Sequence, residues 1–239
     1  MLSPARRHRL NALAAKEAAK ADEFGGVRPD VSVYQLQLTE LKNDIHVLRS
    51  IQSQDKRAEV KAELIPKHMP YVEGIIQSGA KVEQDEVITT IMLWCFDCGQ
   101  FDQGLNIAEY ALKNDLKMPD SFIRSTASIV AEEIGNAAHK SYQDGEVFNL
   151  SVLEKASQLT ADFDMHDQIR AKLYLGIGRT FLQLNRGSEA VAFLKMAIAK
   201  NDRCGGKQDL QKAEKLYKEQ LKNSPEPMLN ADGSQVVDD

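Results

Sequence analysis

Apolar residues recur three and four positions apart along nearly the whole chain, and the alternation typical of β-strands is almost absent. Turn signals such as Ser78-Gly79 and Met118-Pro119-Asp120 interrupt the pattern at short intervals, and Asp85 predicts the N-cap of one helix. Short helices joined by tight turns bury their apolar faces by packing against one another. The sequence therefore predicts an all-α fold.

The composition indicates a globular protein with its own core, since 43% of the 239 residues are hydrophobic and 27% are charged. No run approaches the roughly 18 to 20 consecutive apolar residues of a membrane helix, and no apolar stretch follows the basic N-terminus. Three cysteines do not make a disulfide framework. We therefore expect no membrane partner and a location in the cytoplasm of the cell that makes the protein.

The first segment, residues 1–28, is basic. Ser3-Pro4 predicts the start of a helix, and Gly25-Gly26 predicts its end. At about 100° per residue, four cations fall within about 80° of one another. These four, the basic stripe, are Arg6, Arg9, Lys16 and Lys20.

A basic stripe on one helical face can contact successive DNA phosphates without reading base sequence. On this interpretation residues 1–28 form a DNA-contact segment, although a solvated basic end explains the same residues equally well. The predicted DNA-binding residues are Arg6, Arg7, His8, Arg9, Lys16 and Lys20.

Residues 30–65 carry a heptad pattern. Six apolar residues, the seam, are spaced three, four, three, four and three positions apart: Val31, Tyr34, Leu38, Leu41, Ile45 and Leu48. Such a seam predicts an oligomerisation helix and a homo-oligomer. The repeat lasts only about two and a half heptads, so a helix packed on its own domain is an equally good interpretation.

Residues 66–222 predict a domain of helical hairpins. Pro66 and Pro70 indicate a corner at its start. Phe122 to Tyr142 predicts a longer amphipathic helix with Ile123 on its inner face.

The segment from Asp167 to Asp202 is similar to a tetratricopeptide repeat, in which two helices pack through small residues at fixed offsets. The residues at that motif's positions are Tyr174, Ile177, Gly178, Phe181, Ala190, Leu194 and Ala197. Asn185 stands where the turn glycine of the repeat usually lies. The spacing to an earlier, weaker match is not a multiple of the repeat period, so we predict similar hairpins and not a regular array.

Candidate chemistry is sparse. Cys95-Phe-Asp-Cys98 has CxxC spacing, but no second ligand pair completes a zinc site, and core-facing or half-buried cysteines are the preferred interpretation. The five histidines lack metal-ligand spacing and are interpreted as surface or cap residues. Asp120 with Glu132 and Glu133 is the nearest approach to a nuclease site, but capping and a solvated face explain them better. We predict no catalytic residue, no metal and no cofactor.

Several short runs are specific in residue type and order: Ser3-Pro-Ala-Arg-Arg-His8, Glu63-Leu-Ile-Pro66, Pro70-Tyr-Val-Glu-Gly74, Met92-Leu-Trp94, Asp97-Cys-Gly99, Ile107-Ala-Glu-Tyr-Ala-Leu112, Leu116-Lys-Met-Pro119 and Arg170-Ala-Lys-Leu173. Together they resemble the small terminase subunit of enterobacterial P-two-type phages, over most of residues 1–222. The resemblance implies a packaging protein that binds the cohesive-end site of concatemeric double-stranded viral DNA. It also implies that the chain oligomerises and directs the ATP-driven large terminase subunit in the host cytoplasm.

That family has also been described as an endonuclease subunit, because it directs cohesive-end cleavage. Since the residues suggest no hydrolytic site, we expect site recognition from this chain and hydrolysis from the large subunit. Two alternatives stay open: a helical-hairpin scaffold without direct DNA contact, and an endonuclease in its own right. Residues 223–239 predict a disordered acidic tail where some relatives are lysine-rich, which leaves the basic stripe as the expected DNA contact.

Overall fold

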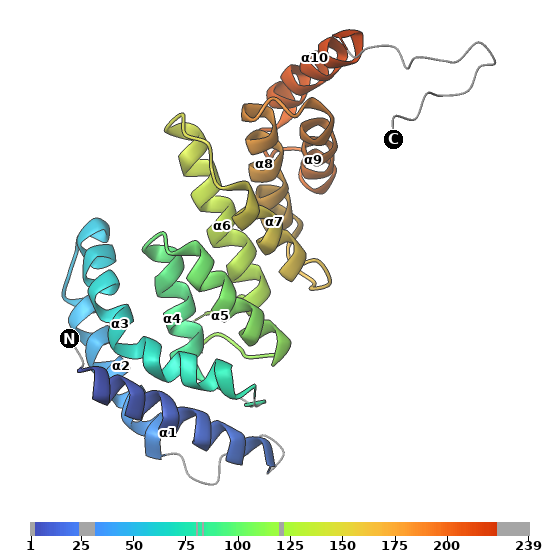
Figure 1. Ribbon diagram of the computed structural model, residues 1–239. Helices are drawn as coiled ribbons and strands as arrows, with labels where there is room; N and C mark the ends of the chain where they lie inside the picture. The colour runs from blue at the N-terminus through green and yellow to red at the C-terminus, as the bar shows by residue number, and fades with distance from the viewer. Residues whose placement is uncertain (1–2, 24–31, 80, 83, 120–121, 224–239) are drawn as a thin grey trace.

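The computed structural model describes residues 3–23, 32–79, 81–82, 84–119 and 122–223. Within these ranges the chain forms ten helices and no strand, which confirms the predicted all-α fold. Three helices lie at one end, antiparallel pairs stack along the middle, and the last helix lies at the other end (Figure 1). The parts of the prediction that fall outside the description are Val31, Gly25-Gly26, Asp120 and the acidic tail.

The first helix, α1 (Pro4–Glu23), begins where the sequence predicts. The hydroxyl oxygen of Ser3 accepts a hydrogen bond from the backbone nitrogen of Arg6 at 3.3 Å. Proline tolerates the first helical position because its missing N–H would have no partner there.

α1 packs closely on α3 (Gln54–Ser78) through small residues. Ala14 and Ala18 of α1 are fully buried, and Gly74 of α3 lies against Ala14 and the backbone of Asn11. A Cβ atom at Gly74 would come within 2.4 Å of the backbone oxygen of Asn11, so glycine is required at this crossing. The close approach holds α1 on the molecule although the helix has few large apolar side chains.

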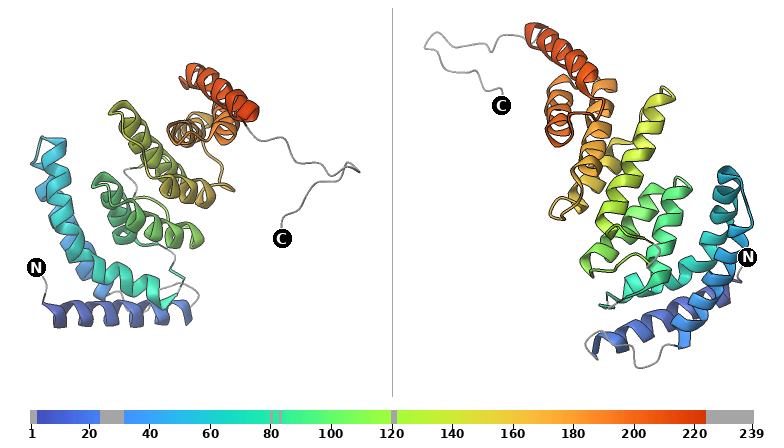
Figure 2. Two further views of the ribbon diagram at one scale, coloured as in Figure 1. Left: turned by 45° about the horizontal axis from the view of Figure 1, so that its top comes forward. Right: turned by 180° about the vertical axis from the view of Figure 1, so that it is seen from behind.

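The prolines predicted to mark a corner lie inside one continuous helix. α3 runs through both Pro66 and Pro70, and it changes direction midway along its length (Figure 2). A proline removes one backbone hydrogen bond and bends a helix, and packing on both sides of the bend keeps the helix from ending. The predicted domain boundary between residues 65 and 66 falls within this helix.

The remaining helices are α2 (Ser32–Arg49), α4 (Glu86–Asp97), α5 (Phe101–Lys113), α6 (Thr126–Gln143), α7 (Leu150–Leu159), α8 (Asp167–Gln183), α9 (Gly187–Lys200) and α10 (Lys207–Asn223). α4 pairs with α5, α6 with α7 and α8 with α9, and each pair contacts the next. The Asp85 carboxylate caps α4 as predicted, accepting from the backbone nitrogens of Val87 and Ile88 at 3.0 and 3.2 Å. Among the described helices, none is both long and apolar enough to cross a bilayer.

α6 starts later than the sequence pattern predicts. Its N-cap is Ser125, whose side-chain oxygen accepts from the backbone nitrogen of Ser128 at 3.3 Å. Ile123 was expected on the inner face of this helix, yet it precedes the helix and is fully exposed. The Ser125 hydrogen bond sets the start of the helix. It satisfies a backbone N–H of the first turn, which has no carbonyl of a preceding turn to bind.

The hairpin of α8 and α9 has the close packing expected from its small residues. A Cβ atom at Gly178 would lie 2.7 Å from the side chain of Leu194, so the helices cross with little space between them. Asn185, in the turn, adopts a φ of +57°. This left-handed conformation favours glycine but is also open to asparagine, which explains the residue at that position.

A buried ionic cluster ties α10 to α6 and α8. The Arg179 Nε atom donates to the Asp209 carboxylate at 2.8 Å, and the hydroxyl of Tyr142 donates to the same carboxylate at 3.0 Å. The guanidinium also lies over the Tyr142 ring, 4.4 Å from its centre. Its Nη1 atom donates to His139 Nδ1 at 3.0 Å.

Candidate nucleic-acid interface

Most of the cations predicted to contact DNA lie on the outer side of α1, whereas Arg7, about 20° around the helix from the buried Ala14, lies beside Glu63 and Pro66 of α3. The predicted residues with described side chains are all exposed: Arg6, Arg7, His8, Arg9 and Lys16. Lys20 belongs to α1, but its side chain lies outside the description. At 1.5 Å per residue, Arg6 and Lys16 are about 15 Å apart along the helix, close to the axial length of four to five base pairs of DNA.

The packing of α1 decides which way the basic stripe faces. Ala18 is buried against α3, and Lys16 lies two positions away, which places it about 160° around the helix. Arg9 lies five positions from the buried Ala14, about 140° around the helix. The stripe therefore faces solvent because the alanines occupy the opposite side.

Two carboxylates lie close to the stripe: Glu40 of α2 contacts Arg6, and Glu17 of α1 itself contacts the start of α2. The Nη2 atom of Arg6 lies 3.8 Å from Glu40, and both side chains are well exposed. An exposed pair of this kind contributes about 0 to 1 kcal/mol. Glu17 of α1 accepts from the backbone nitrogen of Val33 at 3.2 Å, so it binds the start of α2, where a negative charge is favourable.

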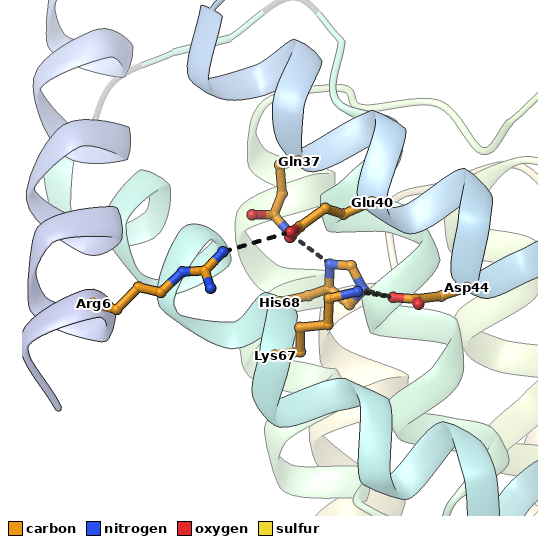
Figure 3. A network of polar contacts seen from close by, with 6 residues as sticks. All are labelled: Arg6, Gln37, Glu40, Asp44, Lys67 and His68. Atoms are coloured by element: carbon orange, nitrogen blue, oxygen red, sulfur yellow. Dashed lines mark hydrogen bonds and ion pairs between the residues drawn. The ribbon is translucent and has the colours of Figure 1, made fainter. Parts of the chain in front are cut away.

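A buried polar network joins α2 and α3 beside the stripe (Figure 3). His68 is fully buried, and its Nδ1 atom lies 2.6 Å from the amide nitrogen of Gln37. Its Nε2 atom lies 2.9 Å from Asp44, and Lys67 contacts the same carboxylate oxygen at 2.7 Å. The geometry fits a neutral imidazole that accepts from Gln37 and donates to Asp44.

The burial of His68 corrects the prediction that every histidine is a surface or cap residue. Its partners, Gln37 and Asp44, are seven positions apart and therefore lie on one face of α2. Glu40, between them on that face, is the residue that reaches Arg6 of α1 (Figure 3). The network thus joins three helices next to the basic stripe, and only this i, i+7 polar pair could have indicated it.

Acidification is expected to weaken the contact between α2 and α3. Burial lowers the pKa of His68 below its ordinary value of 6.5, with the Asp44 hydrogen bond opposing. As the pH falls, His68 therefore takes up a proton in the unfolded chain before it does so in the folded chain. The contribution of His68 to the free energy of unfolding is full well above pH 6.5 and decreases as the pH drops below about 6.5. Urea unfolding at pH 7.5, 6.0 and 5.0 measures this loss.

The variant His68→Gln should reduce the free energy of unfolding by about 1–3 kcal/mol at pH 7.5, because the side chains of Gln37 and Asp44 lose their hydrogen bonds to the imidazole. Its stability should then depend less on pH. His46→Gln, at an exposed histidine on α2, is the matched control and should keep the wild-type profile. A His68→Gln profile as steep as that of the wild type would contradict this assignment.

The seam of α2 packs largely within its own chain. Leu38, Leu41 and Leu48 are buried, while Tyr34 and Ile45 are half-buried. The accessible edges of Leu38, Leu41 and Ile45 line a groove of about 640 Å³ between α2 and α4. Self-association through the seam stays a prediction, and this groove is where a further helix would meet it.

The CxxC cysteines match their predicted role as small core residues. Cys95 is buried, Cys98 is half-buried, and both are free thiols. Burial raises the pKa of Cys95 to about 12 and also raises that of Cys98, so the reactive thiolates are disfavoured.

Glu132 forms an ion pair with Arg124. Among described residues, no three histidine, cysteine or acidic side chains gather closely enough to hold a metal ion.

Comparison with known proteins gives three findings. A family model described as "Phage small terminase subunit" matches residues 38–168. The "Terminase, endonuclease subunit" of Escherichia phage P2 is 34% identical over 231 residues, which cover 97% of this chain and 90% of that protein. The "Probable terminase, endonuclease subunit" of Haemophilus phage HP1 is 23% identical over 133 residues, 55% of this chain and 47% of that protein. No solved structure matches the chain.

Proposed function

Because the chain belongs to the phage small terminase subunit family and so has a role in phage DNA packaging, we propose that it binds the cohesive-end site of viral DNA directly. In this proposal it forms a homo-oligomer and directs the large terminase subunit in the host cytoplasm. α1 supplies the contact with DNA, and the helices behind it supply the contacts between proteins.

The exposed arginines of α1 carry the DNA-binding proposal. Arg6, Arg7 and Arg9 all face solvent within one turn of the helix. The crossing at Gly74 holds that helix against α3. Cations on a fixed helix contact phosphates without a large loss of conformational freedom, so both the charge and its placement favour DNA binding.

Replacing Arg6, Arg7 and Arg9 together with alanine is expected to weaken binding to cohesive-end duplex DNA by roughly a hundredfold at about 0.15 M salt. Each lost phosphate contact reduces the slope of log affinity against log salt by about 0.9, so the slope should fall by about 2.7. Fluorescence anisotropy over a salt series measures both quantities.

A matched control removes three exposed lysines outside α1: Lys113, Lys117 and Lys140. This variant loses the same charge and should keep the wild-type salt slope. Equal slopes in the arginine variant and the wild type would end the assignment to α1. A wild type that binds no cohesive-end DNA while still binding the large subunit would favour the scaffold alternative.

The groove beside the seam is the proposed contact between copies. Its lining combines the seam with apolar Trp94 and Phe122, so it continues the heptad face of α2. Ile45→Asp should shift the mass measured by light scattering toward monomer. Val47→Asp, on an exposed part of the same helix, should leave the mass unchanged. Leu41 is only 1% exposed, so its substitution would disturb folding and could not test the contact.

An endonuclease acting by itself is the second candidate, because both relatives are named endonuclease subunits. The purified chain with Mg²⁺ and cohesive-end DNA, in the absence of the large subunit, tests it. Intact DNA is the result expected if this chain only recognises the site. Nicking would assign catalysis to this chain.

A further inference from the structure

A pocket of about 350 Å³ is lined by residues of α6, α8 and the turn before α10. These helices lie toward the opposite end of the molecule from α1 (Figure 1). Three permanent cations and one carboxylate line it, together with two aliphatic side chains of α8. These residues are Arg124, Lys172, Arg203, Glu132, Ile169 and Leu175.

Two of the three cations have no carboxylate partner in the described part of the chain. Glu132 forms an ion pair with Arg124. The Lys172 Nζ atom instead donates to the neutral Asn136 oxygen at 2.7 Å, and Arg203 forms no described side-chain ion pair. Glu133 interacts electrostatically with Lys172 but does not line the pocket. The pocket therefore carries a net positive charge.

The pKa of a neighbouring histidine is affected by the same positive charges. The pKa of His139, which also lines the pocket, is lowered by burial and then by the charges of Arg179 and Lys172. An anion that entered the pocket would gain from cations that now repel one another. The electrostatics thus favour a negatively charged occupant.

The aliphatic side chains of the lining indicate which class of anionic molecule fits the pocket. Ile169 and Leu175 line the pocket and are almost fully buried. Duplex DNA presents phosphates and sugars on its outside, and its apolar thymine methyl groups lie within the major groove, so it offers few apolar groups to the floor of a pocket. A peptide that places carboxylates next to aliphatic side chains matches both parts of the lining.

We propose that the occupant of this pocket is the acidic segment of the same chain, residues 224–239. These residues lie outside the described part, and their sequence contains no lysine or arginine. It contains four carboxylates: Glu226, Asp232, Asp238 and Asp239. Val236-Val237 directly precede the last two, so aliphatic and acidic groups adjoin as the pocket requires.

The length of the segment permits this contact. α10 begins four residues after Arg203 and has 17 residues, so it carries the chain about 26 Å at 1.5 Å per residue. An extended segment covers about 3.3 Å per residue, so the 13 residues from Ser224 to Val236 span at most about 43 Å. Val236 and the residues after it can therefore return to the pocket.

Cys204 provides a reporter within the pocket. It is half-buried and lines the pocket, whereas burial disfavours the thiolates of Cys95 and Cys98. In the full chain, the substitutions Glu226→Gln, Asp232→Asn, Asp238→Asn and Asp239→Asn remove the negative charge of the segment. A tethered segment has an effective concentration on the order of 1 mM, so releasing it should speed the labelling of Cys204 about fivefold. Mass spectrometry identifies the labelled cysteine.

Binding in trans supplies the second measurement. A fluorescent peptide with the sequence of residues 224–239 should bind the charge-neutralised full chain, and salt at about 1 M should release it because charges are screened within about 3 Å. Lys172→Glu with Arg203→Glu should abolish peptide binding. The exposed pair Lys113→Glu with Lys140→Glu is the matched control and should leave binding unchanged.

Three results would overturn the proposal. The first is a Cys204 labelling rate that neutralisation of the segment leaves unchanged. The second is peptide binding that survives reversal of Lys172 and Arg203. The third is protection of Cys204 by duplex DNA but not by the peptide, which would make the pocket a nucleic-acid surface. None of these results bears on DNA contact by α1, so the two proposals fail separately.

Discussion

Asp209→Ala is expected to destabilise the C-terminal hairpin and α10 by about 3–5 kcal/mol, because it leaves the Arg179 guanidinium buried without its carboxylate. The Asp209 side chain is 6% exposed and that of Arg179 is 11% exposed, so water can replace little of the lost interaction. Tyr142 also loses the acceptor for its hydroxyl. Urea unfolding measures the total loss, and hydrogen exchange shows whether α10 opens before α4 and α5.

A double variant separates the ion pair from simple packing. Arg179→Met with Asp209→Leu removes both charges, so it should cost less than Asp209→Ala alone. The control is Asp202→Ala, since Asp202 pairs with Lys207 at 2.5 Å but its side chain is 73% exposed. That pair should contribute no more than about 1 kcal/mol. If Asp209→Ala cost as little as this control, the cluster would not be what holds α10.

Gly74→Val is expected to separate α1 from α3. The first carbon of the new side chain would lie 2.4 Å from the backbone oxygen of Asn11 and 3.0 Å from the Cβ atom of Ala14. Backbone cannot move aside as a flexible side chain does, so the helices must part. Overpacking should cost about 2–3 kcal/mol, which shifts the equilibrium between docked and undocked α1 roughly 30- to 150-fold toward the undocked helix. Limited proteolysis should show faster cleavage within α1.

Glu73→Val is the matched control, because it places the same side chain on an exposed neighbouring position of α3. It should leave the cleavage of α1 at the wild-type rate. Under the proposed function, Gly74→Val should also weaken binding to cohesive-end DNA, since the basic stripe loses its fixed orientation. Cleavage of α1 no faster than in Glu73→Val would show that the crossing tolerates a larger residue.

Much of the fold was predictable because its signals are local. Ser3 and Asp85 cap helices through hydrogen bonds to backbone atoms two or three residues away. Asn185, which departs from the glycine usual in the hairpin motif, adopts a left-handed φ of +57° that asparagine also tolerates. Where local signals compete, prediction was wrong: Ile123 has the right spacing for the inner face of α6, but the Ser125 cap begins the helix after it.

The cationic residues of the candidate interface could be identified from the sequence, but the packing that orients them could not. The cations of α1 can be read directly from the chain, whereas the outward direction of the stripe depends on Ala14 meeting Gly74, sixty positions away. His68 was misread for the same reason, because its burial comes from α2 and no neighbour in sequence reveals it.

The sequence alone determined that this chain is helical, that helices begin after Ser3 and Asp85, and which residues bring positive charge, because helical spacing and caps act over a few neighbouring residues. Only the tertiary structure decided that the seam of α2 is largely covered by its own chain and that α3 continues through two prolines. It alone decided that cations from the segment before α6, from α8 and from the turn before α10 line one pocket. Burial and charge clustering arise from contacts between residues distant in sequence, which no local pattern specifies.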